Sequence, residues 1–393
     1  MRFSGSDGVS IIGVGMTPQS RRDMQPGEMA LQAASEALQD AGLSAKQVKL
    51  AVVSNALGGA LCEQECIRGQ SWLNGIGFEG TGVVNVENAC AGGVNAFHLA
   101  SLAALAGESP ILVVAVEKMW TGDRQATMEA IEEGLPSQER ISKRKDLGDN
   151  PSGSVFMGLN ASWARRQLES RETTVTHLAA AASKARFHGS LNPLAQHRSP
   201  LSIEEILSAP TVVAPLTRPM CSSFTDGAAA LVIKSGAIAN APQVVASVLL
   251  SGDGSVEYHD RMAAAGAAAF EESGFGPEDI DVVEVHDATS AEELLALEAL
   301  GFYPEGKSGA ATLAGDTYVG GSGVTVNPSG GLVARGHPIG ATGACQLVEL
   351  ATQLRGRAGE RQSEGARLAM AVNTGGIIGD DVASVGVVIL RQG

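Results

Sequence analysis

The sequence predicts an α/β protein made of two similar halves, and two observations support this. Apolar, β-favouring runs alternate with helical segments along the chain, which is typical of sheets covered by helices. The order of these segments also repeats: AGLSAKQVKLAVV at 41–53 resembles SGFGPEDIDVVEV at 273–285, at a constant offset of 232 residues. A repeat in the same order implies duplicated domains, with a functional site where they meet.

The first half is expected over residues 1–238. Its first helix has strong helix formers and ends at Gly42, and its strands are short apolar runs. The stretch from about 120 to 200 breaks the pattern and is expected to form an excursion of loops and helices, charged and exposed in its first part. The expected elements are strands at 10–14, 50–54, 83–86, 110–116 and 227–235, and helices at 27–41, 95–107, 153–169 and 172–187.

The second half is expected over residues 239–393. Its apolar run at 282–285 is continuous, as in a strand buried on both faces. A glycine turn opens the helix GATGACQLVELATQL (340–354), as in ACAGGVNAFHLASLAAL (89–105) of the first half, and the last strand resembles the strand at 227–235. Each half should therefore form its own sheet with helices on its faces.

Composition and charge argue against several classes of function. The chain has 28 basic and 43 acidic residues and a net charge of −15, so nucleic acid and anionic membranes are not expected partners. No run of about 18 apolar residues is present, so no membrane span is expected. The N-terminus lacks the apolar core of a signal peptide, and five cysteines, an odd number, fit reduced thiols. We therefore expect a cytoplasmic protein.

The cysteine in VNVENACAGGV, Cys90, is the first candidate catalytic residue. It lies between an apolar strand and a helix that opens after Gly92 and Gly93. A helix N-terminus favours a thiolate, so we expect a lowered pKa for Cys90. The alternative is that Cys90 is a small buried hydrophobic residue, as many free cysteines are. Cys62 and Cys66 lack the second Cys or His pair of a zinc site, so no metal is expected.

Three further stretches carry polar side chains near strand ends, where sites collect in α/β folds. His286 and Asp287 follow the strand at 282–285, His337 lies in a glycine-rich loop, and Asn373 is expected just past a strand. Each has a simple reading on its own: a surface pair, a loop cap and a left-handed turn. Together with Cys90, these stretches supply a thiol, two imidazoles and glycine N–H groups, which are the groups that an acyl transfer through a cysteine needs.

Several of these motifs resemble the thiolase superfamily. They are NACAGG around Cys90, VNPSGG, GHPIGATG around His337, and DGAAALVI. More narrowly, the stretches SLNPLAQHRSPLSIEEILSAP and VEVHDATSAEELLALEALGFYPEG resemble the sterol-carrier-protein type of thiolase, and the resemblance covers nearly the whole chain. It implies two βαβαβαββ halves in a five-layered αβαβα architecture, and an acyl-CoA acyltransferase.

The resemblance also implies a role for each candidate residue. Cys90 would carry the acyl group as a thioester, and His337 would activate the thiol. His286 would stand in a first oxyanion hole, and the backbone N–H groups of Cys90 and Gly375 would form a second. The expected substrate-binding residues are Gly336, Pro338, Asp287 and Gly376. Coenzyme A is expected as part of the substrate, without a separate cofactor.

The sequence departs from the family pattern at both acid/base positions. The C-x-G motif of most thiolases reads Asn373-Thr374-Gly375 here, and the cysteine of the HDCF motif is replaced by Ala288. An asparagine amide cannot take a proton from an α-carbon at neutral pH. Non-decarboxylative carbon–carbon chemistry needs such a base, so thiolysis of the usual kind is not expected.

Three functions remain open from the sequence. The first is a thiolase-type acyltransferase with an unusual second half-reaction. The second is a thiolase-like retro-aldolase, with Tyr258, Tyr303 or Tyr318 as the phenol acid. The third is an acyl-CoA or lipid-binding protein, or a subunit completed by a small accessory protein. A homodimer is expected from the resemblance, with the strand that contains Val84 at the interface.

Overall fold

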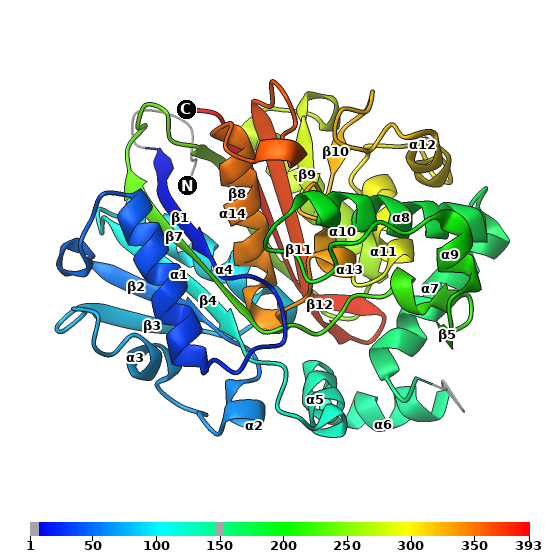
Figure 1. Ribbon diagram of the computed structural model, residues 1–393, viewed down its shortest axis with the longest axis horizontal. Helices are drawn as coiled ribbons and strands as arrows, with labels where there is room; N and C mark the ends of the chain where they lie inside the picture. The colour runs from blue at the N-terminus through cyan, green and yellow to red at the C-terminus, as the bar shows by residue number, and fades with distance from the viewer. Residues whose placement is uncertain (1–7, 147–151) are drawn as a thin grey trace.

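The computed structural model describes residues 8–146 and 152–393, and it confirms the predicted α/β fold (Figure 1). The start of the predicted first half, residues 1–7, and a few residues of the polar excursion lie outside this described part. The strands of the first half are β1 (Val9–Met16), β2 (Leu50–Ser54), β3 (Gly82–Val86), β4 (Ile111–Glu117) and β7 (Gly227–Ser235). Those of the second are β8 (Gln243–Ser251), β9 (Val282–Glu284), β10 (Thr325–Val326), β11 (Leu368–Ile378) and β12 (Asp381–Arg391).

The two halves share one topology. The strand order is β1-β7-β4-β2-β3 in the first half and β8-β12-β11-β9-β10 in the second. In each half the three strands at the far edge pair in parallel and the other two pair antiparallel. The internal repeat in the sequence therefore corresponds to a repeated fold.

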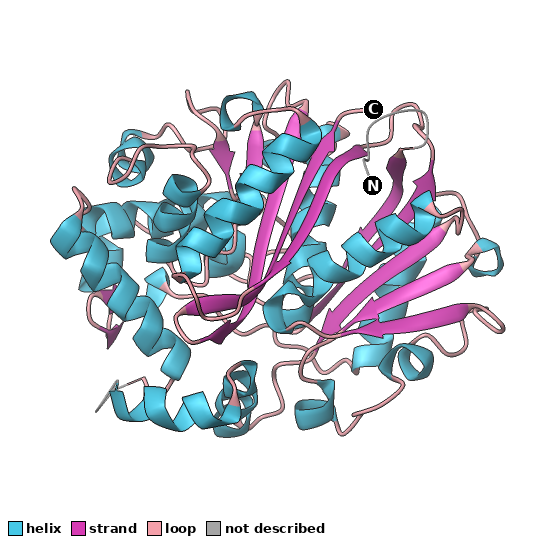
Figure 2. Cartoon of the chain, turned by 180° about the vertical axis from the view of Figure 1, so that it is seen from behind, coloured by secondary structure: helices cyan, strands magenta, loops and turns pink. Residues whose placement is uncertain are grey.

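The predicted separation into two sheets is only partly correct. The strands β1 and β8 pair through Val9 with Val244 and Ser10 with Gln243, so that all ten strands form one continuous sheet. Figure 2 shows the two groups of strands diverging on either side of this short connection. The two halves still bury separate outer faces under their own helices.

The helices form three layers around the two halves of the sheet. Helix α1 (Pro26–Asp40) covers the outer face of the first half, and α10 (Tyr258–Ser273) and α11 (Ser290–Ala299) cover that of the second. Helices α4 (Gly92–Leu105) and α14 (Thr342–Leu354) lie between the halves and share one apolar core with the inner faces of the strands. This is the predicted αβαβα layering, and burial of these apolar faces is its main stabilisation.

Two glycines of the sequence repeat allow α4 and α14 to pack closely. A Cβ atom added at Gly93 would lie 2.6 Å from the backbone nitrogen of Ala344. One added at Gly343 would lie 2.6 Å from the backbone nitrogen of Val94. The contact is reciprocal, and at such distances only glycine fits on either helix. It sets the N-terminal ends of the two central helices side by side.

The predicted excursion forms helices that reach over the second half (Figure 1). Helix α7 packs on α11, and α8 packs on α11, α12 and α13. The helices of the excursion are α5 (Arg124–Ile131), α6 (Ser137–Asp146), α7 (Val155–Ser170), α8 (Val175–Leu191) and α9 (Ile203–Ser208). The remaining helices are the short α2 (Gly58–Cys62), α3 (Arg68–Trp72), α12 (Ser308–Ala314) and α13 (Gly331–Ala334), and β5 (Thr211–Val213) pairs with β6 (Leu216–Thr217).

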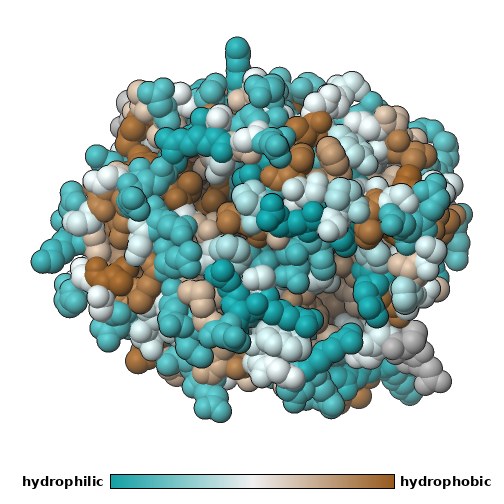
Figure 3. All heavy atoms as spheres, viewed as in Figure 1, coloured by the Kyte–Doolittle hydropathy of each residue, from teal (hydrophilic) through white to brown (hydrophobic). Residues whose placement is uncertain are grey.

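One face of the molecule is mostly polar (Figure 3). Hydrophilic residues prevail on the face seen in Figure 3, with apolar residues scattered between them. No helix among residues 8–146 and 152–393 is both long and apolar enough to cross a membrane.

Candidate active site

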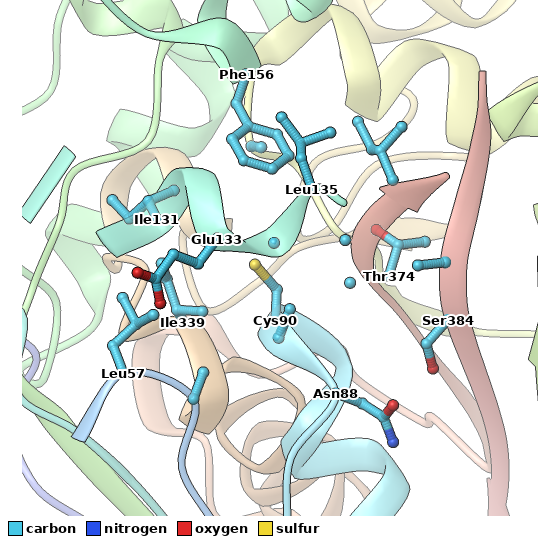
Figure 4. A pocket seen from close by; sticks show the side chains of 18 of the residues that line it. Leu57, Asn88, Cys90, Ile131, Glu133, Leu135, Phe156, Ile339, Thr374 and Ser384 are labelled. Carbon is cyan, nitrogen blue, oxygen red and sulfur yellow. The ribbon is translucent and has the colours of Figure 1, made fainter. Parts of the chain in front are cut away.

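A cavity of about 530 Å³ lies where the two halves meet. Its walls come from both halves and from the excursion, and the sulfur of Cys90 points into it (Figure 4). Leu57 and Ile339 lie on one side of Cys90 and Thr374 on the other, while Leu135 and Phe156 lie across the cavity. Apolar walls with a few convergent polar groups are typical of a small-molecule site.

Cys90 lies on a tight turn between β3 and α4. Residues Ala89–Ala91 form a single 3₁₀ turn, and Ala89 has φ +47°, a left-handed conformation that costs free energy in a residue with a side chain. The turn is held from the other half, because a Cβ atom added at Gly375 would lie 2.3 Å from the Asn88 carbonyl oxygen. The close contact places Gly375 of β11 against the turn that carries Cys90.

His337 lies in the loop between α13 and α14. Its backbone N–H donates to the Ser223 carbonyl at 3.0 Å, and its Nδ1 lies 2.7 Å from the Thr342 hydroxyl oxygen. The Thr342 hydroxyl donates to the Pro338 carbonyl, so it accepts from Nδ1–H, and Nε2 of His337 carries a free lone pair. Burial, the neighbouring His286 ring and Arg335 hold the pKa of His337 well below its ordinary value. His337 is therefore a neutral imidazole near pH 7.

A buried carboxylate holds the other end of this loop. Glu117, at the end of β4, accepts from the backbone N–H of Gly340 at 2.9 Å and from those of Ala56 and Leu57. Burial raises the pKa of Glu117, and these three donors oppose that rise. The contact ties the His337 loop to the first half.

His286 follows β9 and enters the cavity from the second half. Its Nδ1 lies 3.1 Å from Oε1 of Glu292, in the first turn of α11. Its Nε2 is buried and has no hydrogen-bond partner. The rings of His286 and His337 meet edge to face, with centroids 5.3 Å apart and an interplanar angle of 79°.

The structure brings Cys90, His286 and His337 together, although they are up to 247 positions apart in the sequence. One ligand-type atom of each lies within 4.8 Å of those of the other two. Three such donors are also the number that a catalytic zinc site uses, and within the described residues this is the one cluster that could hold a metal ion. We still predict that none binds, because the same three groups suffice for thiol-based acyl transfer.

The predicted fall in the pKa of Cys90 is wrong. Burial raises the pKa of the Cys90 thiol, and the nearby carboxylates of Glu292 and Glu117 raise it further. The helix N-terminus was the basis of the prediction, but it does not outweigh burial and two negative charges. Cys90 is a neutral thiol at pH 7, so it needs a base at the moment of attack.

Of the other predicted site residues, some line the cavity and some do not. Ala288, Gly375 and Gly376 line the cavity. Gly336 and Pro338 flank His337 in the chain but do not line the cavity. Asp287 is fully buried, and its carboxylate accepts hydrogen bonds from the backbone N–H groups of Leu332 and Val333 in α13. Asp287 therefore holds α13 in place, away from the expected substrate.

Asn373 is inside β11 and not beyond its end. It is fully buried, its side-chain amide donates to Oε1 of Gln346 in α14, and it does not line the cavity. Because side chains alternate along a strand, the neighbour Thr374 faces the cavity instead. The position of the usual C-x-G cysteine is thus occupied by a residue that faces the central helix.

No role for Glu292 was predicted from the sequence, and Tyr258 was predicted only as one of three possible acids. The Tyr258 hydroxyl donates to Oε1 of Glu292 at 2.7 Å and also contacts the Thr374 hydroxyl. Burial and the Glu292 charge raise the pKa of Tyr258 well above its ordinary value, so it stays protonated. A signal for Glu292 was present, since it lies six positions after His286, in the first turn of the next helix.

Comparison with known families and proteins agrees with this fold. The chain matches the thiolase N-terminal domain over residues 9–237 and the thiolase C-terminal domain-like family over residues 250–389. Sterol carrier protein 2 of Rattus norvegicus is 33% identical over 395 residues, covering 93% of this chain and 70% of that protein. An acetyl-CoA acetyltransferase of Methanothermobacter thermautotrophicus is 34% identical over 381 residues, covering 94% and 96%.

Other similar proteins have different names. Benzoylsuccinyl-CoA thiolase subunit BbsB of Thauera aromatica is 32% identical over 387 residues, covering 94% of each chain. Among solved structures, the Ltp2-ChsH2(DUF35) aldolase has a TM-score of 0.78 at 20% identity, covering 98% of this chain and 97% of that one. Human mitochondrial 3-ketoacyl-CoA thiolase in complex with CoA has a TM-score of 0.71 at 16% identity, covering 100% and 99%. These two structures share the fold, and the family matches show that this chain belongs to the thiolase family.

Proposed function

We propose that this protein is an acyl-CoA acyltransferase that carries its acyl group as a thioester on Cys90. One observation supports this function most strongly: a cavity-facing thiol lies within 4.8 Å of two imidazole nitrogens contributed by the other half of the chain. A thiol, a neutral imidazole base and nearby backbone donors are the groups that thioester exchange requires.

In the proposed first half-reaction, His337 acts as the base. Its Nε2 takes the proton of the Cys90 thiol while Sγ attacks the carbonyl carbon of an acyl-CoA. The tetrahedral oxyanion is held by the backbone N–H groups of Cys90 and Gly375. The carbon–sulfur bond to coenzyme A then breaks, and the departing thiolate takes the proton from His337. The second half-reaction forms or breaks a carbon–carbon bond on a 3-ketoacyl-CoA-like substrate.

Isotope exchange tests this proposal without depending on the carbon–carbon step. A protein that forms an acyl thioester should catalyse exchange of labelled coenzyme A into a panel of unlabelled acyl-CoAs, because only acylation and its reversal are needed. Exchange with at least one acyl-CoA, absent from protein alkylated at Cys90, is the expected result. A non-catalytic acyl-CoA-binding protein would bind members of the panel and exchange none.

We predict that this exchange has no acidic limb near pH 6.5. The neutral form of His337 is the active one, and the pKa of His337 is held well below its ordinary value of 6.5. His337 therefore remains unprotonated as the pH falls from 8 to about 6, and the rate should stay constant over that range. An exchange rate that falls tenfold between pH 7 and pH 6 would contradict a neutral His337 as the base.

Restoring a cysteine at position 288 should raise thiolysis of a 3-ketoacyl-CoA. Ala288 lines the cavity and occupies the HDCF cysteine position, so Ala288→Cys adds a thiol at the site of the missing acid/base group. Since a general base contributes about 10²–10⁴ in rate, we expect a rise of about tenfold or more. Robust thiolysis by the unmodified protein, unchanged in Ala288→Cys, would show that the cysteine position is not limiting.

We also propose that the protein is a homodimer through β3. This strand is at the edge of the ten-stranded sheet, and the Val84 side chain on it is 43% exposed. Exposed edge strands are normally paired or covered. Light scattering at micromolar concentration should give twice the chain mass, and a charged substitution, Val84→Lys, should shift it toward the monomer. A small accessory subunit remains a separate prediction.

A retro-aldolase is the second candidate, because the Tyr258 hydroxyl lies in the cavity wall beside Glu292. Aldol cleavage needs an acid and a base but no thioester between the substrate and Cys90. The two candidates therefore differ in their dependence on Cys90, which a Cys90 variant tests directly.

A further inference from the structure

The pairing of His286 with Glu292 fixes where the hydrogen of this imidazole lies. An ionised carboxylate only accepts hydrogen bonds, so the 3.1 Å contact between Nδ1 and Oε1 requires the hydrogen on Nδ1. In the neutral ring, Nε2 then carries a lone pair and no hydrogen, and this buried atom has no hydrogen-bond partner. His286 cannot donate to an oxyanion through Nε2 until it has taken up a proton.

Glu292 is held firmly for this contact. Its Oε1 also accepts from the Tyr258 hydroxyl at 2.7 Å, and its backbone N–H lies 3.4 Å from the Thr289 hydroxyl oxygen at the start of α11. The N-terminal turn of a ten-residue helix favours the negative charge of the carboxylate. A fixed negative charge behind Nδ1 stabilises the imidazolium, as it does in catalytic pairs of a carboxylate and a histidine.

We propose that His286 is the proton-transfer residue of the carbon–carbon step, with Glu292 as its positioning residue. The proposal rests on the acyltransferase function proposed above. It supplies a base for a site that lacks both cysteines at the usual acid/base positions.

The step balances with the groups present. Nε2 of His286 takes a proton from the α-carbon of the second acyl-CoA, and the C–H electron pair forms the enolate. The enolate carbon attacks the carbonyl carbon of the Cys90 thioester, a carbon–carbon bond forms and the carbon–sulfur bond to Cys90 breaks. The Cys90 thiolate then takes the proton from His286, whose ring lies within the same 4.8 Å cluster. The reverse sequence is thiolytic cleavage, in which coenzyme A accepts the acyl group from Cys90.

The titratable groups around His286 come from several elements, and most are neutral near pH 7. The pKa of His337 is held well below 6.5, burial lowers that of His259 to about 4, and the pKa values of Tyr258 and Cys90 are raised. Glu292 is the carboxylate in contact with the ring, while Glu117 and Glu87 act on the Cys90 thiol beside it. Glu292 is therefore the charged group that acts on the His286 ring by direct contact.

Hydrogen–deuterium exchange at the α-carbon of an acyl-CoA, followed by NMR in D₂O, isolates this step from acylation. Glu292→Gln should lower the α-carbon exchange rate about 10²-fold or more, the usual contribution of a general base. It should alter labelled coenzyme A exchange, which depends on Cys90 and His337, far less than it lowers α-carbon exchange, although loss of the Glu292 charge also removes one cause of the raised pKa of the Cys90 thiol. Glu298→Gln is the matched control, because it removes a carboxylate from the same helix, outside the cavity, where Glu298 pairs with Arg171. Glu298→Gln should retain both the α-carbon exchange rate and the coenzyme A exchange rate of the unmodified protein.

A pH profile separates proton transfer from a merely structural role. Without the carboxylate the imidazolium is less stable, so the acidic limb of the residual α-carbon exchange in Glu292→Gln should move to lower pH. If Glu292→Gln does not fold, His286→Gln should show the same selective loss of α-carbon exchange. Equal losses of both exchange reactions, or α-carbon exchange that survives in both variants, would overturn the proposal. If the unmodified protein exchanged coenzyme A but no α-proton, this proposal would fail alone, whereas absence of coenzyme A exchange would overturn the proposed function as well.

Discussion

Replacing Cys90 with alanine should lower labelled coenzyme A exchange by about 10³-fold or more, because no other group in the cavity can form the thioester. The Cys90 sulfur points into the cavity and not into the packed core (Figure 4), so its removal should leave the fold intact. Retained folding is checked by thermal unfolding, and the loss of activity by single-turnover exchange with the best acyl-CoA of the panel.

A second cysteine variant provides the control for Cys90. Cys62 is also partly buried but does not line the cavity, so Cys62→Ser should retain full exchange. Carbon–carbon cleavage that persists in Cys90→Ala would favour the retro-aldolase, since aldol cleavage has no acyl-enzyme. Coenzyme A exchange that persists in Cys90→Ala would refute the proposed nucleophile.

Removal of His337 should have the second largest effect. His337→Ala deletes the base for a thiol whose pKa is raised by burial, Glu292 and Glu117, and we expect a loss of about 10²–10⁴ in coenzyme A exchange. The remaining rate should then depend on thiolate formed by hydroxide. The exchange rate of His337→Ala should rise by about tenfold for each pH unit as long as the pH is below the thiol pKa. The rate of the unmodified protein should instead stay constant between about pH 6 and pH 8.

The dependence of Cys90 on His337 can be measured by combining the two substitutions. Groups that act as one unit show strongly non-additive effects, so Cys90→Ala with His337→Ala should be hardly slower than Cys90→Ala alone. His98→Ala is a suitable control, because His98 lies on α4, the helix that follows Cys90, and contacts Ser247. Additive losses would mean that His337 stabilises the transition state independently of the thiol.

The repeat and the strand–helix alternation predicted most of the fold. Local apolar runs located β4, β7 and the central helices to within a few residues, because these segments are buried and regular. The bridge between β1 and β8 was not predictable, since it consists of two residue pairs set by how the halves dock. The placement of the excursion was not predictable either, because its Leu135 and Phe156 complete the cavity wall through long-range packing.

The candidate site was predictable where a motif and a loop position coincide. Cys90, His286 and His337 follow from such motifs, and the structure places them together. The charge state of Cys90 was not predictable, because burial and the approach of Glu117 and Glu292 are properties of the folded protein. Asn373 was misplaced for a related reason: the end of a strand is set by its partner, and β11 continues beside β12 to Ile378.

Mass spectrometry of the intact protein after incubation with acyl-CoAs tests the central claim most directly. We predict that at least one acyl-CoA adds the mass of its acyl group to the protein. The added mass should map to the peptide containing Cys90, disappear on treatment with excess coenzyme A, and be absent from Cys90→Ala. No added mass with any acyl-CoA, or an acyl group found on another residue and still present in Cys90→Ala, would contradict the account.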